Sequence, residues 1–299
     1  MHTPVLFLVY KRPDTTRQVF EAIRQARPPR LYVAADGPRK DVPGQAEKVQ
    51  QVRDIVLKGV DWDCEVKTLF REENLGCKYG VSGGIDWFFE NEEEGIILED
   101  DTLPSQSFFW FCQELLERYR DDKRIFVISG DNFQEGQDCS MGDSYYFSCF
   151  NHCWGWATFK RAWEHFDVDM KQWPEVQKKG CLKYIWSDKS ALSYWTNIFQ
   201  SVYENKVDTW DYYWTFSCWL QNGLTILPNV NLVQNIGFGM DATHTTTSRE
   251  ASKAYQLNFP LIHPEYMMRD MQADNCTQSY HFQKPLLHRI TGKIKRYLK

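Results

Sequence analysis

The segment GIILEDD, residues 95–101, decides the fold, because a short apolar run breaks off into the three consecutive carboxylates Glu99, Asp100 and Asp101. An apolar run of this length is typical of a strand buried on both faces, and ligands of open α/β sheets bind at the carboxyl ends of strands. Adjacent carboxylates repel one another unless a cation or hydrogen-bond donors compensate. The segment therefore predicts a strand that ends at a site for Mg²⁺ or Mn²⁺, ions that prefer oxygen ligands. A solvated acidic turn is the alternative.

Strand-length apolar runs alternate with helical patterns in the first half of the chain. Strands alternating with helices indicate βαβ units, and right-handed crossovers place the carboxyl ends of the strands on one edge. The sequence thus predicts an α/β fold with a mainly parallel central sheet flanked by helices. Before the acidic strand we expect strands at 5–10, 31–35 and 64–70, and helices at about 14–26 with Asp14 as N-cap, around 49–56 and at about 79–89.

Polar residues follow successive strands of this predicted sheet. Taken singly, Asp36 before Gly37 and Pro38 is more typical of a turn, and Arg12 or Lys78 of a surface charge. Their coincidence on one edge is what predicts a nucleotide site. The strand-end residues that we expect to meet there are Arg12, Asp36, Arg71, Asn74, Lys78 and the acidic triplet.

The second half of the chain is rich in aromatic residues. Twelve tryptophans occur in 299 residues, more than core packing usually requires, and flat apolar rings suit sugars or bases. Gly155 lies between Trp154 and Trp156, where a glycine gives a ligand close access to the backbone. We expect this element to shape a sugar pocket, with core packing as the alternative. Residues 167–189 are polar with scattered tryptophans and predict a loop-rich insertion.

Composition excludes some classes of protein. The formal net charge of −5 argues against a nucleic-acid partner, which calls for a basic face. Nine cysteines in no paired zinc spacing, with no signal peptide before the first strand, predict free thiols in a reducing, cytoplasmic compartment. Cys149, His152 and Cys153 could hold a metal, but a structural zinc site needs four ligands and no second pair is apparent.

The carboxy-terminal tail, residues 284–299, is amphipathic and basic. No apolar run approaches the roughly 20 residues of a membrane-spanning helix. The tail carries apolar residues on one helical face and mostly basic residues on the other. Such a stripe predicts either peripheral contact with an anionic membrane surface or a terminal helix docked on its own domain.

Seven ordered motifs carry a resemblance to a known family. The chain resembles the GT-A glycosyltransferases, mostly bacterial sugar transferases of polysaccharide gene clusters and, more remotely, the N-acetylglucosaminyltransferase I family. The resemblance implies a GT-A domain at 1–248, with a nucleotide-sugar-binding half at 1–130 and an acceptor-side half at 131–248, then an extension at 249–299. The motifs are YKRP at 10–13, ADG at 35–37, NLG at 74–76, LEDD at 98–101, CWGWAT at 153–158, WD at 210–211 and NIGFG at 235–239.

The resemblance also implies ligands and roles. The donor is a nucleotide-diphosphate sugar, UDP-linked by analogy, and the acceptor is a glycan or lipid-linked sugar. Asp101 holds Mn²⁺ or Mg²⁺ on the diphosphate, Asp100 contacts ribose or metal, and Glu99 orients the donor sugar. Asp36 is similar to the carboxylate that reads the nucleobase, with Arg12 beside it. His244 is the candidate for a late metal or diphosphate contact, a surface or capping histidine being the alternative.

Inverting glycosyl transfer needs a base that takes the proton of the acceptor hydroxyl. Asp211 lies between Trp210 and Tyr212, where apolar burial raises the pKa of a carboxyl group, and it matches the Trp-Asp motif of the family. We predict that Asp211 is the base and that Trp210 joins the sugar pocket. A helix N-cap is the alternative role for Asp211, and a retaining outcome stays open.

Other functions share parts of this pattern. A sugar-1-phosphate nucleotidyltransferase should show a Gly-rich, basic phosphate loop after its first strand, and residues 10–13 lack one. A two-metal phosphohydrolase should recruit several His and Asp ligands from dispersed loops, and the sequence offers few. A non-catalytic sugar-binding protein is the third alternative.

Overall fold

The fold is built on one large sheet, seen in a computed structural model that describes residues 1–134, 136, 141–237 and 253–282. In these residues the sheet has eight strands in the order β3-β2-β1-β4-β8-β6-β9-β7, and β5 pairs with β10 separately. The strands are β1 Val5–Val9, β2 Arg30–Ala35, β3 Glu65–Phe70, β4 Glu94–Glu99, β5 Thr102–Pro104, β6 Ile125–Ser129, β7 Tyr145–Ser148, β8 Trp156–Phe159, β9 Leu224–Pro228 and β10 Val233–Asn235.

Most strands of the large sheet run in one direction. The strand β8 is antiparallel to both β4 and β6, so β6 and its parallel neighbour β9 point the same way as β1 to β4. Only β8 and β7 run against this direction. The predicted α/β fold with a mainly parallel sheet flanked by helices is therefore confirmed, with two antiparallel strands in the second half.

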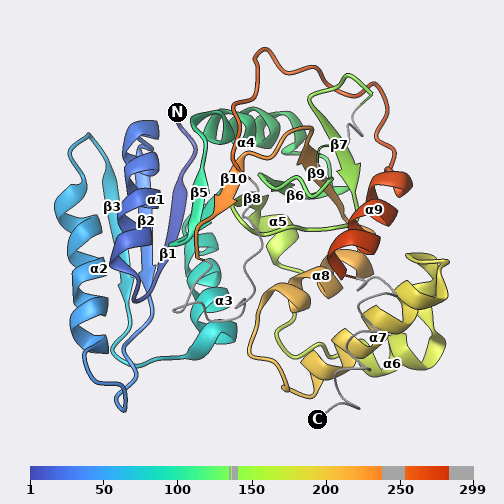
Figure 1. Ribbon diagram of the computed structural model, residues 1–299, viewed down its shortest axis with the longest axis horizontal. Helices are drawn as coiled ribbons and strands as arrows, with labels where there is room; N and C mark the ends of the chain where they lie inside the picture. Colours follow the sequence, from blue (N-terminus) through green and yellow to red (C-terminus); the bar gives the residue numbers. More distant parts are fainter. Residues whose placement is uncertain (135, 137–140, 238–252, 283–299) are drawn as a thin grey trace, which may run out of the picture.

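Helices cover the sheet and form a separate layer at one end. Figure 1 shows α1 and α2 beside β1 to β3, and α6, α7 and α8 together at the lower right. The helices are α1 Pro13–Ala26, α2 Gln45–Gly59, α3 Gly76–Phe89, α4 Gln106–Tyr119, α5 Lys160–Trp163, α6 Trp173–Lys179, α7 Lys189–Tyr203, α8 Asp211–Leu220 and α9 Met271–Thr277, with the short turns η1 Cys181–Tyr184 and η2 Gln278–Phe282.

The strand order reverses at β1. The chain runs outward from β1 to β2 and β3, then returns to place β4 on the other side of β1. Right-handed crossovers put α1 and α2 on one face and α3 on the other, and α3 packs closely enough on β1 and β2 that a side chain at Gly84 would meet Leu8 and Ala34. Because a crevice forms where the strand order reverses, the carboxyl ends of β1 and β4 mark the place for a ligand.

Several local predictions need correction. The first helix has Arg12 at its N-cap position and Pro13 as its first helical residue, so Asp14 lies in the first turn and is not the cap. Proline suits this position because its missing N–H would have no partner there. The insertion at 167–189 is not loop-rich: it contains α6 and η1, and Trp173 and Leu182 bury their side chains in the core.

Residues 253–282 lie against the main body of the protein. The backbone N–H groups of Leu257 and Ile262 donate to the hydroxyls of Ser107 and Ser144 at 2.9 and 2.8 Å. The buried carboxylate of Asp274 accepts from Ser148. The predicted boundary at 248 and the tail at 284–299 fall outside the described residues, so the domain division stays a prediction. Where the structure is described, none of the helices has the length and apolar character needed to cross a bilayer.

Candidate active site

A cavity of about 1320 Å³ lies at the carboxyl ends of β1 and β4. Its other walls come from residues 150–154, from the start of α8 and from η2. Most of the residues predicted for the site are thus brought together. Those that line the cavity are Arg12, Asp36, Asn74, Glu99, Asp100, Asp101, Trp154, Trp210 and Asp211.

Arg12 joins two carboxylates of the acidic triplet. Its guanidinium donates to Asp100 and, at 2.8 Å, to Oδ2 of Asp101. The backbone N–H of Tyr10 donates to Asp100 at 3.1 Å. Donors therefore compensate part of the acidic charge, as the sequence requires. The structure places Arg12 on these carboxylates, whereas the predicted arrangement had it beside Asp36.

Burial raises the pKa of two members of the triplet, Glu99 and Asp100. Desolvation, together with the neighbouring charges of Asp101 and Asp100, raises the pKa of Glu99 to about 8. Desolvation also raises the pKa of Asp100 to about 6, against the opposing effect of the Arg12 charge. Both Asp100 oxygens accept hydrogen bonds, one from Arg12 and one from Tyr10. Asp101 accepts from Arg12 through Oδ2 only. Glu99 and Asp101 are therefore the members of the triplet whose negative charge is less compensated by protein donors.

Asp36 and Asn74 form one polar unit at the ends of β2 and β3. The amide of Asn74 donates to Asp36 at 2.8 Å, and the N–H groups of Gly37 and Leu75 donate to the same carboxylate at 3.0 Å. Burial raises the pKa of Asp36, although these N–H donors oppose the shift. The unit both fixes the turn and lines the cavity.

Asp211 is the first residue of α8. The N-cap position belongs to Trp210, so the alternative role of Asp211 as the N-cap is wrong. The Thr209 hydroxyl donates to the Asp211 carboxylate and restricts its orientation. Burial raises the pKa of the Cys77 thiol, and the charges of Glu99 and Asp211 both add to this shift. Cys77 lines the same cavity as both carboxylates, which come from separate elements of the fold.

The predicted tryptophan pocket divides into a core part and a cavity part. Trp156, on β8, is 1% exposed and stacks on Trp210 with ring centroids 5.7 Å apart. Trp154 and Trp210 line the cavity, whereas Trp156 and Gly155 do not. Gly155 has φ +73°, and a side chain there would meet Val233 at 2.8 Å. The glycine thus permits the turn that presents Trp154 on one side and buries Trp156 on the other.

Arg71 and Lys78 do not line the cavity. The Arg71 guanidinium donates to the carbonyl of Gly80 at 2.8 Å, which ties β3 to α3. Lys78 is buried, donates to Asn205 at 3.1 Å and lies 4.3 Å from the centre of the Tyr213 ring. Both side chains connect elements behind the cavity wall. His244, the remaining predicted ligand, lies outside the described residues.

The oxygen donors at the cavity fit a divalent cation that also binds a phosphate group. In the described part of the chain, no three His, Cys, Asp or Glu residues are grouped to hold a metal ion. Mg²⁺ is usually bound through one or two carboxylates together with substrate phosphates and water, which Asp101 and Glu99 can satisfy. A side chain at Gly237 would meet Oδ2 of Asp101 at 2.0 Å, so the glycine keeps the space at that carboxylate open.

Four polar residues at or beside the cavity were not predicted. Asp208 accepts from the N–H groups of Cys77 and Lys78 at 3.1 and 2.9 Å and so caps α3 from a distant loop. Asp131 follows β6 directly, and the rule that singled out the end of β4 could have found it. Of the other two, the sequence singled out His152 only as a possible metal ligand beside Cys149 and Cys153, and nothing local distinguishes Asn151, because the burial of both depends on tertiary packing.

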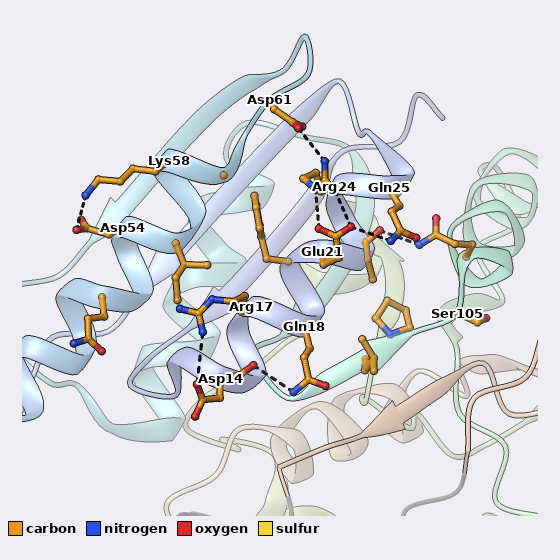
Figure 2. A pocket seen from close by; sticks show the side chains of 18 of the residues that line it. Asp14, Arg17, Gln18, Glu21, Arg24, Gln25, Asp54, Lys58, Asp61 and Ser105 are labelled. Carbon is orange, nitrogen blue, oxygen red and sulfur yellow. Dashed lines mark hydrogen bonds and ion pairs between the residues drawn. The ribbon is translucent and has the colours of Figure 1, made fainter.

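A second hollow, between α1 and α2, has charged walls that are already paired. Figure 2 shows Arg24 between Glu21 and Asp61, and Lys58 reaching Asp54. These are exposed ion pairs on the protein surface, which contribute little to stability. No polar group in this hollow calls for a ligand as the carboxylates of the main cavity do.

Comparisons with known proteins give distant structural likenesses. No protein-family model and no curated protein sequence matches the chain. HddC from Yersinia pseudotuberculosis is similar at 10% identity over 53% of this chain and 77% of that one, with a TM-score of 0.32. UDP-glucose pyrophosphorylase complexed with UDP-glucose is similar at 9% identity over 76% of this chain and 90% of that one, with a TM-score of 0.37. S. aureus TarS 1-349 is similar at 11% identity over 54% of this chain and 47% of that one, with a TM-score of 0.35. Similarities this low say nothing about the chemistry of the site, which has to be inferred from the residues of this chain.

Proposed function

We propose that the protein is a GT-A glycosyltransferase that moves a sugar from a nucleotide-diphosphate sugar to a hydroxyl acceptor, with inversion, in cell-surface polysaccharide or glycan synthesis. One observation carries the proposal: carboxylates from two separate elements, the end of β4 and the start of α8, line one cavity at the reversal of the strand order. A transfer between two bound molecules needs such a division, with one group for the donor and another for the acceptor.

The donor side lies over β1, β2 and β4. In this proposal Asp36 and Asn74 contact the nucleobase, and Asp100 and Arg12 contact the ribose and the diphosphate. Glu99 would orient the donor sugar. A Mg²⁺ or Mn²⁺ ion held by Asp101, when bound, would neutralise charge on the diphosphate and stabilise it as a leaving group.

Asp211 is the proposed base on the acceptor side. It takes the proton of the acceptor hydroxyl while that oxygen attacks the anomeric carbon opposite the diphosphate. The new C–O bond forms as the bond from the anomeric carbon to the diphosphate breaks, and the nucleoside diphosphate carries away the electron pair. The Thr209 hydroxyl holds the base in one orientation.

Two alternatives predict different products. A sugar-1-phosphate nucleotidyltransferase would release pyrophosphate, and its phosphate loop would follow β1. In this chain residues 10–13, which follow β1, read Tyr-Lys-Arg-Pro and contain no glycine. A non-catalytic binding protein would release nothing.

A nucleotide-sugar panel tests the proposal. Thermal unfolding of the protein is followed with each of several UDP-, GDP- and dTDP-sugars, with and without Mn²⁺, because a ligand of the native state raises the midpoint by mass action. The expected result is metal-dependent stabilisation by one nucleotide class, followed by acceptor-dependent release of the nucleoside diphosphate. Stabilisation by none of them, or release of pyrophosphate from a nucleoside triphosphate and a sugar 1-phosphate, would overturn it.

A further inference from the structure

Three buried polar residues of the cavity have no role in the reaction proposed above. Asp131, Asn151 and His152 line the cavity and are 1%, 5% and 8% exposed. Each keeps one buried polar atom without a hydrogen-bond partner among the described residues: Oδ1 of Asp131, Nδ2 of Asn151 and Nε2 of His152. Buried polar groups are nearly always hydrogen-bonded. The described residues hold nine unpartnered buried atoms, and only these three belong to residues that line the cavity, so they are the candidates for hydrogen bonds to a ligand there.

The rest of each side chain is held in place. The second carboxylate oxygen of Asp131 accepts from the N–H of Trp154 at 3.0 Å, and the Asn151 carbonyl accepts from the Thr215 hydroxyl at 2.7 Å. The His152 ring stacks on Phe150 at 10° and meets the edge of Phe133. These contacts fix the orientation of the unpartnered atoms before any ligand binds.

The same cavity wall is aromatic. Phe133 touches both His152 and Trp154, with ring centroids 4.3 and 5.4 Å apart, and the N–H of Trp154 donates to Asp131, so His152 and Asp131 share one aromatic wall. Aromatic rings that can pack on C–H faces, together with polar side chains that line the same cavity, match a pyranose. Burial lowers the pKa of His152 to about 3, so its ring is neutral at physiological pH and offers no charge to an anion.

We propose that Asp131, Asn151 and His152 form a subsite that binds the hydroxyl groups of a neutral pyranose. The Thr215 hydroxyl contacts both the Asn151 carbonyl and the Asp211 main-chain carbonyl, which places the subsite next to the start of α8. That the pyranose is a substrate of glycosyl transfer rests on the proposed function. The binding of a pyranose by these three residues does not.

Two variants and a matched control test the subsite. His152→Phe removes the unpartnered nitrogen and keeps an aromatic ring. Asn151→Leu removes the side-chain amide and nearly preserves the shape of the side chain. The Thr215 hydroxyl can still donate to the main-chain carbonyl of Asp211. Trp186→Phe is the control, because Trp186 also has a buried ring N–H without a partner and packs on Phe150 at 5.4 Å, but it does not line the cavity.

The first probes are the methyl glycosides of glucose, galactose, mannose and N-acetylglucosamine. The second probes are the nucleotide sugars of the panel, each compared with its nucleoside diphosphate. Glycoside binding is followed by saturation-transfer NMR, and nucleotide binding by calorimetry. We expect His152→Phe and Asn151→Leu to weaken sugar binding at least roughly tenfold, as when a polar site loses its partner. The Trp186→Phe control should change sugar binding less than about twofold. The thermal midpoint of His152→Phe should not fall below that of the wild type, since the His152 nitrogen makes no internal hydrogen bond that could be lost.

The outcomes distinguish an acceptor sugar from a donor sugar, and they also decide whether the subsite binds sugar at all. Loss of methyl-glycoside binding with nucleoside diphosphate present identifies an acceptor sugar. Loss of the extra affinity of a nucleotide sugar over its nucleoside diphosphate identifies the donor sugar. Both support the subsite. Unchanged sugar binding in both variants, an equal loss in Trp186→Phe, or no glycoside or nucleotide-sugar binding by the wild type overturns it. Glycoside binding without any nucleotide binding would overturn the proposed function and leave the subsite standing.

Discussion

At the scale of single residues, Arg12 is the side chain on which the acidic end of β4 depends. It contacts Asp100, whose side chain is 3% exposed, and Asp101. Removing one partner of a buried ion pair leaves the other charge uncompensated, which costs more than the pair itself contributes. Arg12 therefore has a structural role as well as its proposed role at the diphosphate.

Arg12→Gln should lower the free energy of unfolding by about 3–5 kcal/mol, because Asp100 would remain buried without its cation. Arg24→Gln is the control, since Arg24 pairs with Glu21 and Asp61 at the exposed surface and should change stability little. Urea denaturation of the three proteins measures the difference. Equal losses in the two variants would show that the Asp100 carboxylate is not held by Arg12.

A glycine comparison tests the turn that separates Trp154 from Trp156. Gly155 and Gly180 have φ +73° and +62°, but only at Gly155 would a new side chain meet the Val233 side chain, at 2.8 Å. Gly180→Ala should cost about 1 kcal/mol from the backbone conformation alone. Gly155→Ala should cost roughly 1–3 kcal/mol more because of overpacking. Chemical denaturation measures both, and similar values would contradict the tight packing described for this turn.

At the scale of elements, the start of α3 depends on a loop more than a hundred residues away. Asp208 accepts from two N–H groups in the first turn of α3 and lies three residues before Asp211. Carboxylates are favourable partners for the free N–H groups of a helix N-terminus. The contact thus couples the position of the proposed base to the helix behind the nucleotide side.

Asp208→Ala should destabilise the protein by about 0.5–2 kcal/mol, as expected for the loss of a capping carboxylate. Asp208→Asn retains one acceptor oxygen and should recover part of that loss. The measurement is the urea midpoint of each variant. A midpoint for Asp208→Ala equal to that of the wild type would mean that the cap adds nothing to stability.

Local signals in the sequence predicted most elements but not their neighbours in the sheet. The apolar runs at 5–10 and 31–35 become β1 and β2 because a buried strand needs such a run. The insertion of β8 between β4 and β6 could not be predicted, since pairing between distant strands leaves no local pattern. The same limit applies to the site: Trp156 matches a motif yet lies in the core, and His152 is buried by tertiary contacts that include Phe133 and Phe150.

At the scale of the whole molecule, the cavity joins the sheet to the aromatic helical layer. The reversal at β1 supplies Arg12 and the acidic triplet, and the chain from Asp131 onward supplies Asp211 and the proposed pyranose subsite. Strand-end rules predicted the first set. In the second set, the Trp-Asp motif predicted Asp211, whereas the positions of Asn151 and His152 depend on how the helices α7 and α8 pack against residues 150–154, which the sequence pattern does not specify.

The stability of the whole protein should fall in acid partly through His152. Burial, with a smaller effect of the His281 charge, lowers the pKa of His152 from 6.5 to about 3. Between these values the unfolded chain binds a proton that the folded protein does not, so stability falls as the pH drops below 6.5. Relative to His152→Phe, the wild type should lose up to roughly 1.4 kcal/mol per pH unit in this window.

Urea denaturation of wild type and His152→Phe at neutral pH and at two lower values within the window measures this difference. Comparing the two proteins cancels the contribution of the other titrating groups. A constant difference between their free energies of unfolding would show that His152 is protonated in the folded protein, contrary to its burial.

The central claim, glycosyl transfer with Asp211 as the base, is tested most directly by Asp211→Asn. Once the panel has identified a donor, acceptor-dependent release of nucleoside diphosphate is measured beside donor affinity for wild type, Asp211→Asn and the control Asp86→Asn, whose carboxylate accepts from Trp163 and does not line the cavity. We predict that Asp211→Asn slows transfer at least roughly 100-fold with donor affinity unchanged, while Asp86→Asn retains turnover. Transfer by Asp211→Asn at the wild-type rate would contradict the account.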